Sequence, residues 1–234
     1  KPIATSLDDL NQLEQIYKES NVHLAAMFGI RYTPWFLTAK TAVDNGEIGK
    51  IRLMHAQKSY RLGQRGENFK HRKTYGGTIP WVGSHAIDWI HWFSGEKFKS
   101  VLAHHSTMDN KDHGALEVSA LCHFEFTNEV FASVSIDYLR PNNAPTHDDD
   151  RIRIAGTKSV LEVRDKKVYL INDKSDEIQE LQLIDPPQIF GDFVDHVRGE
   201  KKCMITANDA FIITRACLKA RNSADENKIM LFNI

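Results

Sequence analysis

The hydrophobic positions of the first sixty residues predict two alternations of helix and strand. Apolar residues recur at helical spacing behind a Thr/Ser cap, at Leu7, Leu10, Leu13 and Ile16, which indicates an amphipathic helix. Val22–Ile30 is short and almost wholly apolar, typical of a strand buried on both faces of a parallel sheet. Thr33–Gly46 predicts a helix ended by Asn-Gly, and Ile48–Tyr60 predicts a long strand.

The middle of the chain changes to period two. Apolar and polar residues alternate from Val118 to Phe126 and again from Val130 to Ile136, with a turn between the two runs. Arg151–Asn172 continues the pattern as three short strands joined by turns. These runs predict an antiparallel meander.

Two helices complete the α/β pattern. The first is expected to open at Pro186 and Pro187, and the second at the cap residue Thr206. We therefore predict an α/β chain whose larger part is α+β, an open and mainly antiparallel sheet with helices on one face.

The second face of the meander mixes apolar and polar side chains. It is too polar for a core and too apolar for a freely solvated sheet: Ser119, Leu121, His123, Glu125, Phe131, Ser133, Ser135, Asp137 and Leu139. Protein interfaces have this composition, so we expect a homodimer, or a tetramer of such dimers, joined through Leu116–Leu139.

Composition excludes several function classes. The 234 residues carry a net charge of -1 with 30 Lys+Arg against 31 Asp+Glu, and no basic stripe favours nucleic acid. No apolar run approaches the roughly 20 residues of a membrane span. The three cysteines, Cys122, Cys203 and Cys217, lie in apolar patterns and indicate reduced core thiols in a cytoplasmic protein.

The stretch GGTIPWVGSHAIDW, Gly76–Trp89, holds the candidate chemistry. His85 lies at a helix start, with Asp88 on the same helical face one turn later, so that Asp88 could orient or charge-balance the imidazole. Neither this pair nor THDDDR at Thr146–Arg151 has a third ligand at convincing spacing, so no metal site is predicted. His147 is kept as a possible substrate contact.

Several short motifs, in order, resemble those of the Gfo/Idh/MocA oxidoreductase family. They are Lys1-Pro2, RYTPWFLTAK, GEIGKI, GGTIPWVGSHAIDW followed by SGEKF, DRIRIAGTKSVLEV, and a last helix beginning near TANDA. The resemblance implies that residues 1–32 are the C-terminal remnant of a dinucleotide-binding Rossmann domain. Residues 33–234 would be the substrate and oligomerisation domain.

The resemblance also implies an NAD(P)-dependent dehydrogenase or reductase that acts on a sugar, polyol or related carbohydrate. Lys1, Pro2 and Arg31 would contact the cofactor, NAD or NADP. No G-x-G-x-x-G turn lies between a strand and a helix, so this chain by itself is expected neither to bind the dinucleotide nor to turn over.

Hydride transfer from a carbinol carbon requires a base for the hydroxyl proton, and Lys1 and His85 hold the family's matching positions. Relatives commonly carry an aspartate four residues before this histidine, where Trp81 stands here. Trp81 can stack on a sugar face but cannot shuttle a proton, and Tyr75 or Lys73 are possible substitutes. A non-catalytic sensor of dinucleotide or sugar that binds a partner protein is the alternative, and glycoside elimination or hydrolysis by transient oxidation is a third reading.

Overall fold

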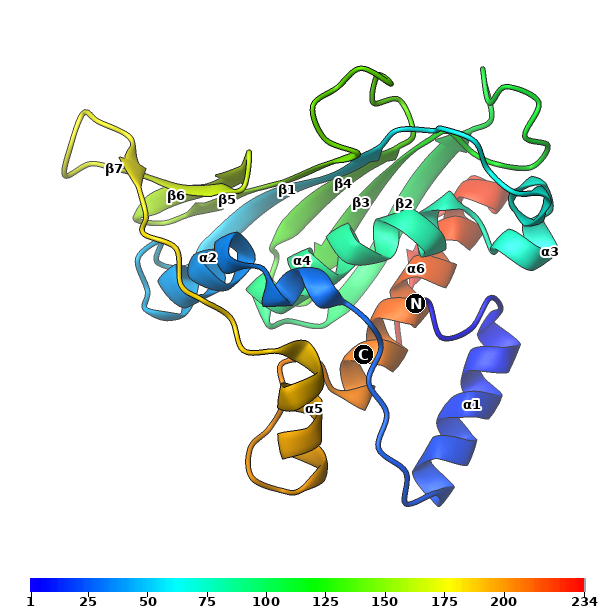
Figure 1. Ribbon diagram of the computed structural model, residues 1–234, viewed down its shortest axis with the longest axis horizontal. Coiled ribbons are helices and arrows are strands. Elements are labelled where there is room, and N and C mark those ends of the chain that lie inside the picture. Colours follow the sequence, from blue (N-terminus) through cyan, green and yellow to red (C-terminus); the bar gives the residue numbers. More distant parts are fainter. Residues whose placement is uncertain (234) are drawn as a thin grey trace.

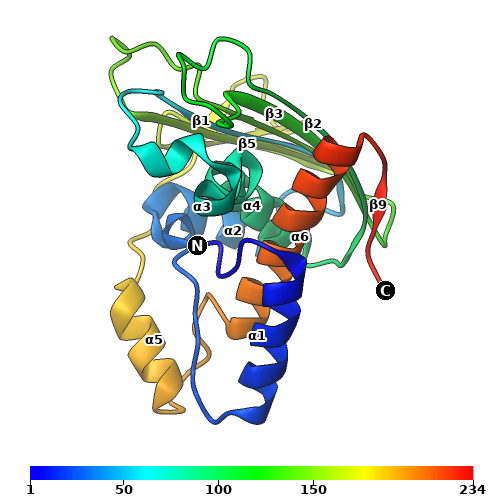
Figure 2. The same ribbon diagram turned by 90° about the vertical axis from the view of Figure 1, so that its right-hand side faces the viewer.

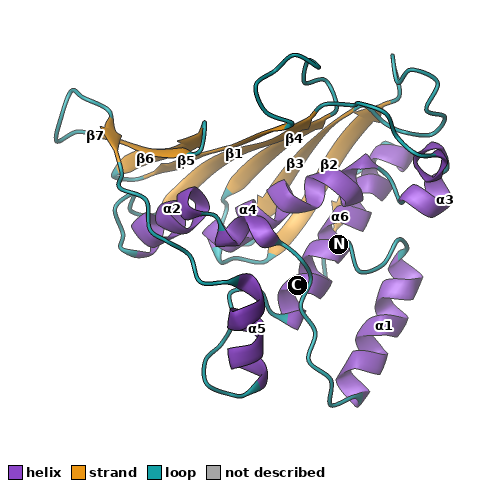
Figure 3. Cartoon of the chain, in the orientation of Figure 1, coloured by secondary structure: helices purple, strands orange, loops and turns teal. Residues whose placement is uncertain are grey.

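The computed structural model describes residues 1–233 as one mixed sheet with helices on a single face (Figures 1 and 3). The sheet runs in the order β8-β7-β6-β5-β1-β4-β3-β2-β9. The strands are β1 (Ile51–Tyr60), β2 (Phe98–Ser106), β3 (Ser119–Phe126), β4 (Phe131–Asp137), β5 (Asp148–Gly156), β6 (Ser159–Arg164), β7 (Lys167–Asn172), β8 (Gln179–Glu180) and β9 (Met230–Leu231). The helices are α1 (Leu7–Glu19), α2 (Pro34–Asp44), α3 (Arg72–Tyr75), α4 (Ser84–Ser94), α5 (Ile189–Val197) and α6 (Ala207–Glu226).

Three helices cover the inner face of the sheet, where the main core lies. Figure 1 and the turned view of Figure 2 place α2, α4 and α6 against this face, while α1 and α5 extend away from it. Inward side chains such as Met54, Val134 and Ile154 are buried beneath Trp89 and Ile213 of the helices. The alternation read from the sequence therefore predicts correctly which strand residues face the core.

The predicted helix ends are mostly confirmed by their caps. The Ser6 hydroxyl accepts from Asp9 N at the start of α1, and Thr206 and Asp209 form a reciprocal capping box at the start of α6. The helix expected after Pro186 and Pro187 begins at Ile189. Residues Ala207, Phe211 and Leu218 of α6 bury Leu10 of α1 in a smaller second core.

Two predictions about the sheet are wrong. The run Val22–Ile30 forms no strand: within the described chain no neighbouring strand pairs with it, and a strand needs partners for its backbone groups. The meander is not continuous either, because β1 inserts between β4 and β5, parallel to β4 and antiparallel to β5. Strand β2, which the sequence analysis did not identify, pairs with β3.

The outer face of the sheet is not covered by any helix of the described residues, and its covering by a second copy of the chain stays a prediction. Leu121 is 43% exposed, Phe131 50% and Leu139 62%. No helix of the described residues crosses this face in Figures 1 and 2. The three cysteines are free and buried, which agrees with the predicted core role.

Candidate active site

Lys1 is tied to the segment that carries His85. Its Nζ donates a 2.7 Å hydrogen bond to the backbone carbonyl of Trp81, in the π-helical turn Ile79–Gly83 that leads directly into α4. Burial, the largest effect, and the nearby charge of Lys58 lower the pKa of Lys1 to about 8. The structure thus brings Lys1, Trp81 and His85 together, as the sequence predicts for a single site.

His85 lies in the first turn of α4 with its ring set among positive charges. Burial lowers its pKa well below 6.5, and the charges of Lys1 and Lys58 act in the same direction. Its Nδ1 atom is buried and has no hydrogen-bond partner among residues 1–233. A neutral imidazole in this setting can accept a proton from a ligand.

Asp88 is bound to Arg31 and not to His85. Both carboxylate oxygens accept from Arg31 Nε, at 3.1 and 3.0 Å, and Arg31 also donates to the Met204 carbonyl and to Asp209. Burial raises the pKa of Asp88 to about 6, against the guanidinium of Arg31, which lowers it. The expected role of Asp88 in orienting the imidazole is therefore replaced by an internal ion pair that joins α4 to the segment before α2.

Arg31 has a correspondingly internal position. The residue is 1% exposed, and its guanidinium contacts Asp88, Asp209 and the Met204 carbonyl. Such a network satisfies a buried charge with several partners. The cofactor contacts assigned to Lys1, Pro2 and Arg31 stay predictions.

A second buried lysine, Lys58, belongs to the same site and was missed by the sequence analysis. Lys58 and Asp150 are directly opposite each other on β1 and β5, both on the helix-covered face. The Lys58 ammonium, 1% exposed, pairs with Asp150 and lies 4.6 Å from the centre of the Tyr60 ring. The signal was present, because Lys58 continues the inward alternation of Met54 and Ala56.

Aromatic rings build a wall around the position of Trp81. The indole, 39% exposed, meets Phe69 edge-on at 5.3 Å and Tyr75 at 5.8 Å between ring centroids. Tyr75 itself is 1% exposed, and its hydroxyl shares hydrogen bonds with Thr78 and Tyr138. Tyr75 therefore supports the wall from within, while the partly exposed Trp81 is available to a ligand.

His147 lies at the rim of this region. Its exposed ring stacks on Tyr60 at 5.0 Å. Burial lowers the pKa of His147, and the charge of Arg65 adds to the effect. A neighbouring pocket of about 230 Å³ is lined by Trp35, Arg140 and residues 148–150, so it adjoins the Lys58–Asp150 pair.

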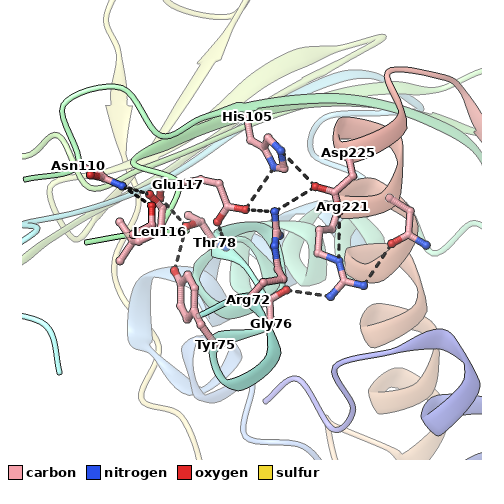
Figure 4. Close-up of polar contacts among 12 residues, drawn as sticks. Arg72, Tyr75, Gly76, Thr78, His105, Asn110, Leu116, Glu117, Arg221 and Asp225 are labelled. Carbon is pink, nitrogen blue, oxygen red and sulfur yellow. Dashed lines mark hydrogen bonds and ion pairs between the residues drawn. The ribbon is translucent and has the colours of Figure 1, made fainter. Parts of the chain in front are cut away.

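A buried carboxylate fixes the loop that precedes α4 (Figure 4). Glu117, 1% exposed, accepts from the Thr78 backbone N–H at 3.0 Å and pairs with Arg72 at 2.5 Å and with His105 at 3.5 Å. Arg221 of α6 donates to the Gly76 carbonyl at 2.9 Å. These contacts hold the start of the GGTIPW segment and hence the approach to His85.

The protein has an open sheet, and Lys58 of the candidate site lies near the carboxyl end of its central strand, β1. This arrangement defines an α/β domain of the class found in oxidoreductase structures. A model of the GFO/IDH/MocA C-terminal domain matches residues 36–162. The chain belongs to the Gfo/Idh/MocA family.

Known relatives agree with this assignment. The structure of an oxidoreductase from Thermotoga maritima superimposes with a TM-score of 0.97 at 55% identity, over 99% of this chain and 71% of that one. An inositol dehydrogenase homologue from Azotobacter vinelandii, solved with NAD+, has the same fold, with a TM-score of 0.83 at 17% identity over 99% of this chain and 71% of that one.

Two curated Bacillus subtilis proteins match over less of their own length. The uncharacterized oxidoreductase YrbE is 28% identical over 68% of this chain and 45% of its own. The scyllo-inositol 2-dehydrogenase (NAD(+)) is 23% identical over 95% of this chain and 66% of its own. This chain thus spans about half to two thirds of these relatives.

Neither a metal centre nor a membrane-spanning helix was found in the part of the chain that the structure describes. No group of three or more His, Cys, Asp or Glu residues within residues 1–233 is placed to hold a metal ion. None of the described helices is both long and apolar enough to span a bilayer.

Proposed function

We propose that the protein is an oxidoreductase that moves a hydride between a carbinol carbon of a sugar or polyol and NAD or NADP. The observation that carries the proposal is a pair of basic groups with lowered pKa values, His85 and Lys1, of which Lys1 is bonded to the turn that leads into the helix of His85. A buried amine and imidazole of this kind can be neutral near pH 8 and take up a hydroxyl proton. Membership of the family and the NAD-binding of relatives support the cofactor class.

In this proposal the residues of the chain accept the proton, balance charge and bind the sugar ring. The nicotinamide supplies the hydride acceptor when bound. Lys1, held by the Trp81 carbonyl, receives the hydroxyl proton, and His85, with its buried free Nδ1, offers a second basic nitrogen to which that proton can pass. Lys58 and Asp150 keep a fixed charge pair beside them, and Trp81 offers an apolar face on which a sugar ring can stack.

Replacement of either base tests the proposal. In the full-length protein, with scyllo-inositol, myo-inositol or D-glucose and NAD+ or NADP+, Lys1→Ala and His85→Asn should each lower kcat about a hundredfold or more. Dinucleotide affinity should change little. Lys18→Ala on α1 and His23→Asn, both exposed, are controls of the same residue types.

Normal turnover in both site variants would refute the assignment of roles. Binding of dinucleotide or sugar without turnover of any substrate would instead favour the non-catalytic sensor.

We also propose that the bare sheet face joins two copies of the chain. The apolar residues Leu121 and Phe131 remain uncovered beside a hollow of about 310 Å³ on this face, lined in part by Leu53 and His123. A self-complementary face closes most simply about a two-fold axis.

A further inference from the structure

Two arginines in the loop after β1, Arg61 and Arg65, are partly buried and have no acidic partner. Neither forms a salt bridge within 4.0 Å to any carboxylate among residues 1–233. In each, the Nε atom is buried and lacks a hydrogen-bond partner within the same residues. Arg65 donates to the Arg61 carbonyl at 3.0 Å, and Arg61 donates to the Ala144 carbonyl.

Nearby carboxylates are already engaged elsewhere. Asp149 accepts from Arg140 and Arg151, and Asp150 is held by Lys58. Asp148 lies 3.7 Å from the Lys58 ammonium. A partly buried guanidinium without a counter-ion is costly, so an anionic ligand at Arg65 would supply what the described residues do not.

Aromatic rings hold the Arg65 guanidinium in a fixed place. Its central carbon lies 4.7 Å from the centre of the Tyr138 ring and 5.4 Å from that of Phe69. The Phe69 ring in turn meets Trp81, whose carbonyl holds Lys1. Phe69 therefore connects the Arg65 guanidinium to the Trp81 ring of the proposed site.

The guanidinium fork matches the geometry of carboxylate and phosphate oxygens, and aromatic stacking preorganises it. We propose that Arg65, supported by Arg61, binds an anionic group of the substrate, so that the substrate is a sugar or polyol bearing a carboxylate or a phosphate. This inference rests on the proposed function. The uncharged Trp81 side chain leaves the approach free of a repelling carboxylate.

Anionic and neutral ligands of the same sugar test the inference. With the full-length protein, calorimetric titration would compare D-glucose, D-glucuronate, D-glucose 6-phosphate and inorganic phosphate in wild type, Arg65→Gln and Arg65→Lys. We expect at least one anion to bind the wild type, Arg65→Gln to weaken it about tenfold or more, and Arg65→Lys to recover it partly. Glucose binding should not change.

Arg164→Gln is the matched control, because Arg164 also lies on an aromatic ring, Tyr169 at 4.5 Å, but has Glu162 beside it. Failure of all three anions to bind, or an equal loss of anion binding in the Arg65 and Arg164 variants, would overturn the inference. A parallel titration with NADP+ adds one more outcome that would overturn it: Arg65→Gln weakening NADP+ binding while leaving the other anions unchanged, since the bound anion would then belong to the cofactor.

Turnover assays with NAD+ or NADP+ on the same ligands, in the Lys1, His85 and Arg65 variants, separate this inference from the proposed function. If neutral sugars are oxidised in a manner that depends on Lys1 and His85 but not on Arg65, the oxidoreductase stands and the anion subsite falls. If an anion binds through Arg65 but no sugar of either kind is oxidised, the subsite stands and the oxidoreductase falls.

Discussion

Replacing Lys58 by methionine removes the charge but retains an unbranched apolar side chain. Asp150, whose side chain is only 12% exposed, then loses the ammonium that neutralises it. Burial already raises the pKa of Asp150, and Lys58 opposes that shift. Breaking one partner of a buried ion pair typically costs about 3–5 kcal/mol, and the remaining exposure of Asp150 favours the lower end. We expect a loss of about 3 kcal/mol in the free energy of unfolding at pH 8.

The loss has a defined dependence on pH. In Lys58→Met the pKa of Asp150 is higher in the folded than in the unfolded chain, so the folded state binds more protons. Stability is therefore retained below the unfolded pKa and falls as pH rises through the raised folded pKa, by up to about 1.4 kcal/mol per pH unit. The deficit of the variant should be smaller at pH 5 than at pH 8.

Urea denaturation followed by circular dichroism at both pH values measures the two deficits. Lys58→Met/Asp150→Asn removes both charges and should recover part of the stability at pH 8. Lys167→Met is a control, because Lys167 and Glu180 form an exposed pair on β7 and β8. Equal losses at pH 5 and pH 8, or no loss at either, would refute the reasoning.

Two further predictions concern activity and assembly. Turnover should rise as pH increases through about 8, because the neutral amine of Lys1 is the proposed base and burial lowers its pKa to about 8. A turnover rate that is constant from pH 7 to pH 9 would contradict this prediction. Phe131→Glu should convert the proposed oligomer to a monomer, as measured by light scattering, whereas Ile16→Glu on the exposed side of α1 should not. A monomeric wild type, or a Phe131→Glu variant that stays oligomeric, would exclude the sheet face as the interface.

The sequence predicts which side of each strand is buried, but it does not predict which strands pair with one another. Alternation along β1, β3 and β4 identifies the buried side of each strand, because that side depends only on local period two. The insertion of β1 between β4 and β5 depends on pairing between distant segments, which no local pattern records. For the same reason the apolar run Val22–Ile30 looked like a strand, although apolarity alone cannot provide a pairing partner.

In the candidate site, too, some residues could be predicted from the sequence and some contacts could not. Lys1, Trp81 and His85 could be predicted because ordered motifs carry them, and the structure places them together. Asp88 lies on the expected helical face, but its partner Arg31 is 57 residues away and could not be deduced from spacing. A lysine such as Lys58 at an inward position of an alternating strand is a signal that sequence reading can use.

The backbone and the side chain of Trp81 have separate roles in the candidate site. The backbone carbonyl at this position still receives the Lys1 ammonium, so the chain geometry that places one base is independent of the side chain. The side chain, in contrast, packs with Phe69 and Tyr75 in an aromatic wall, and the Arg65 guanidinium lies over the Phe69 ring of that wall. An acidic side chain here would add a negative charge to the site, which would favour a protonated Lys1 and oppose an anionic ligand at Arg65. On the two proposals above, tryptophan in place of the aspartate that the resemblance implies would remove a proton carrier and would favour both a neutral Lys1 and an anionic substrate.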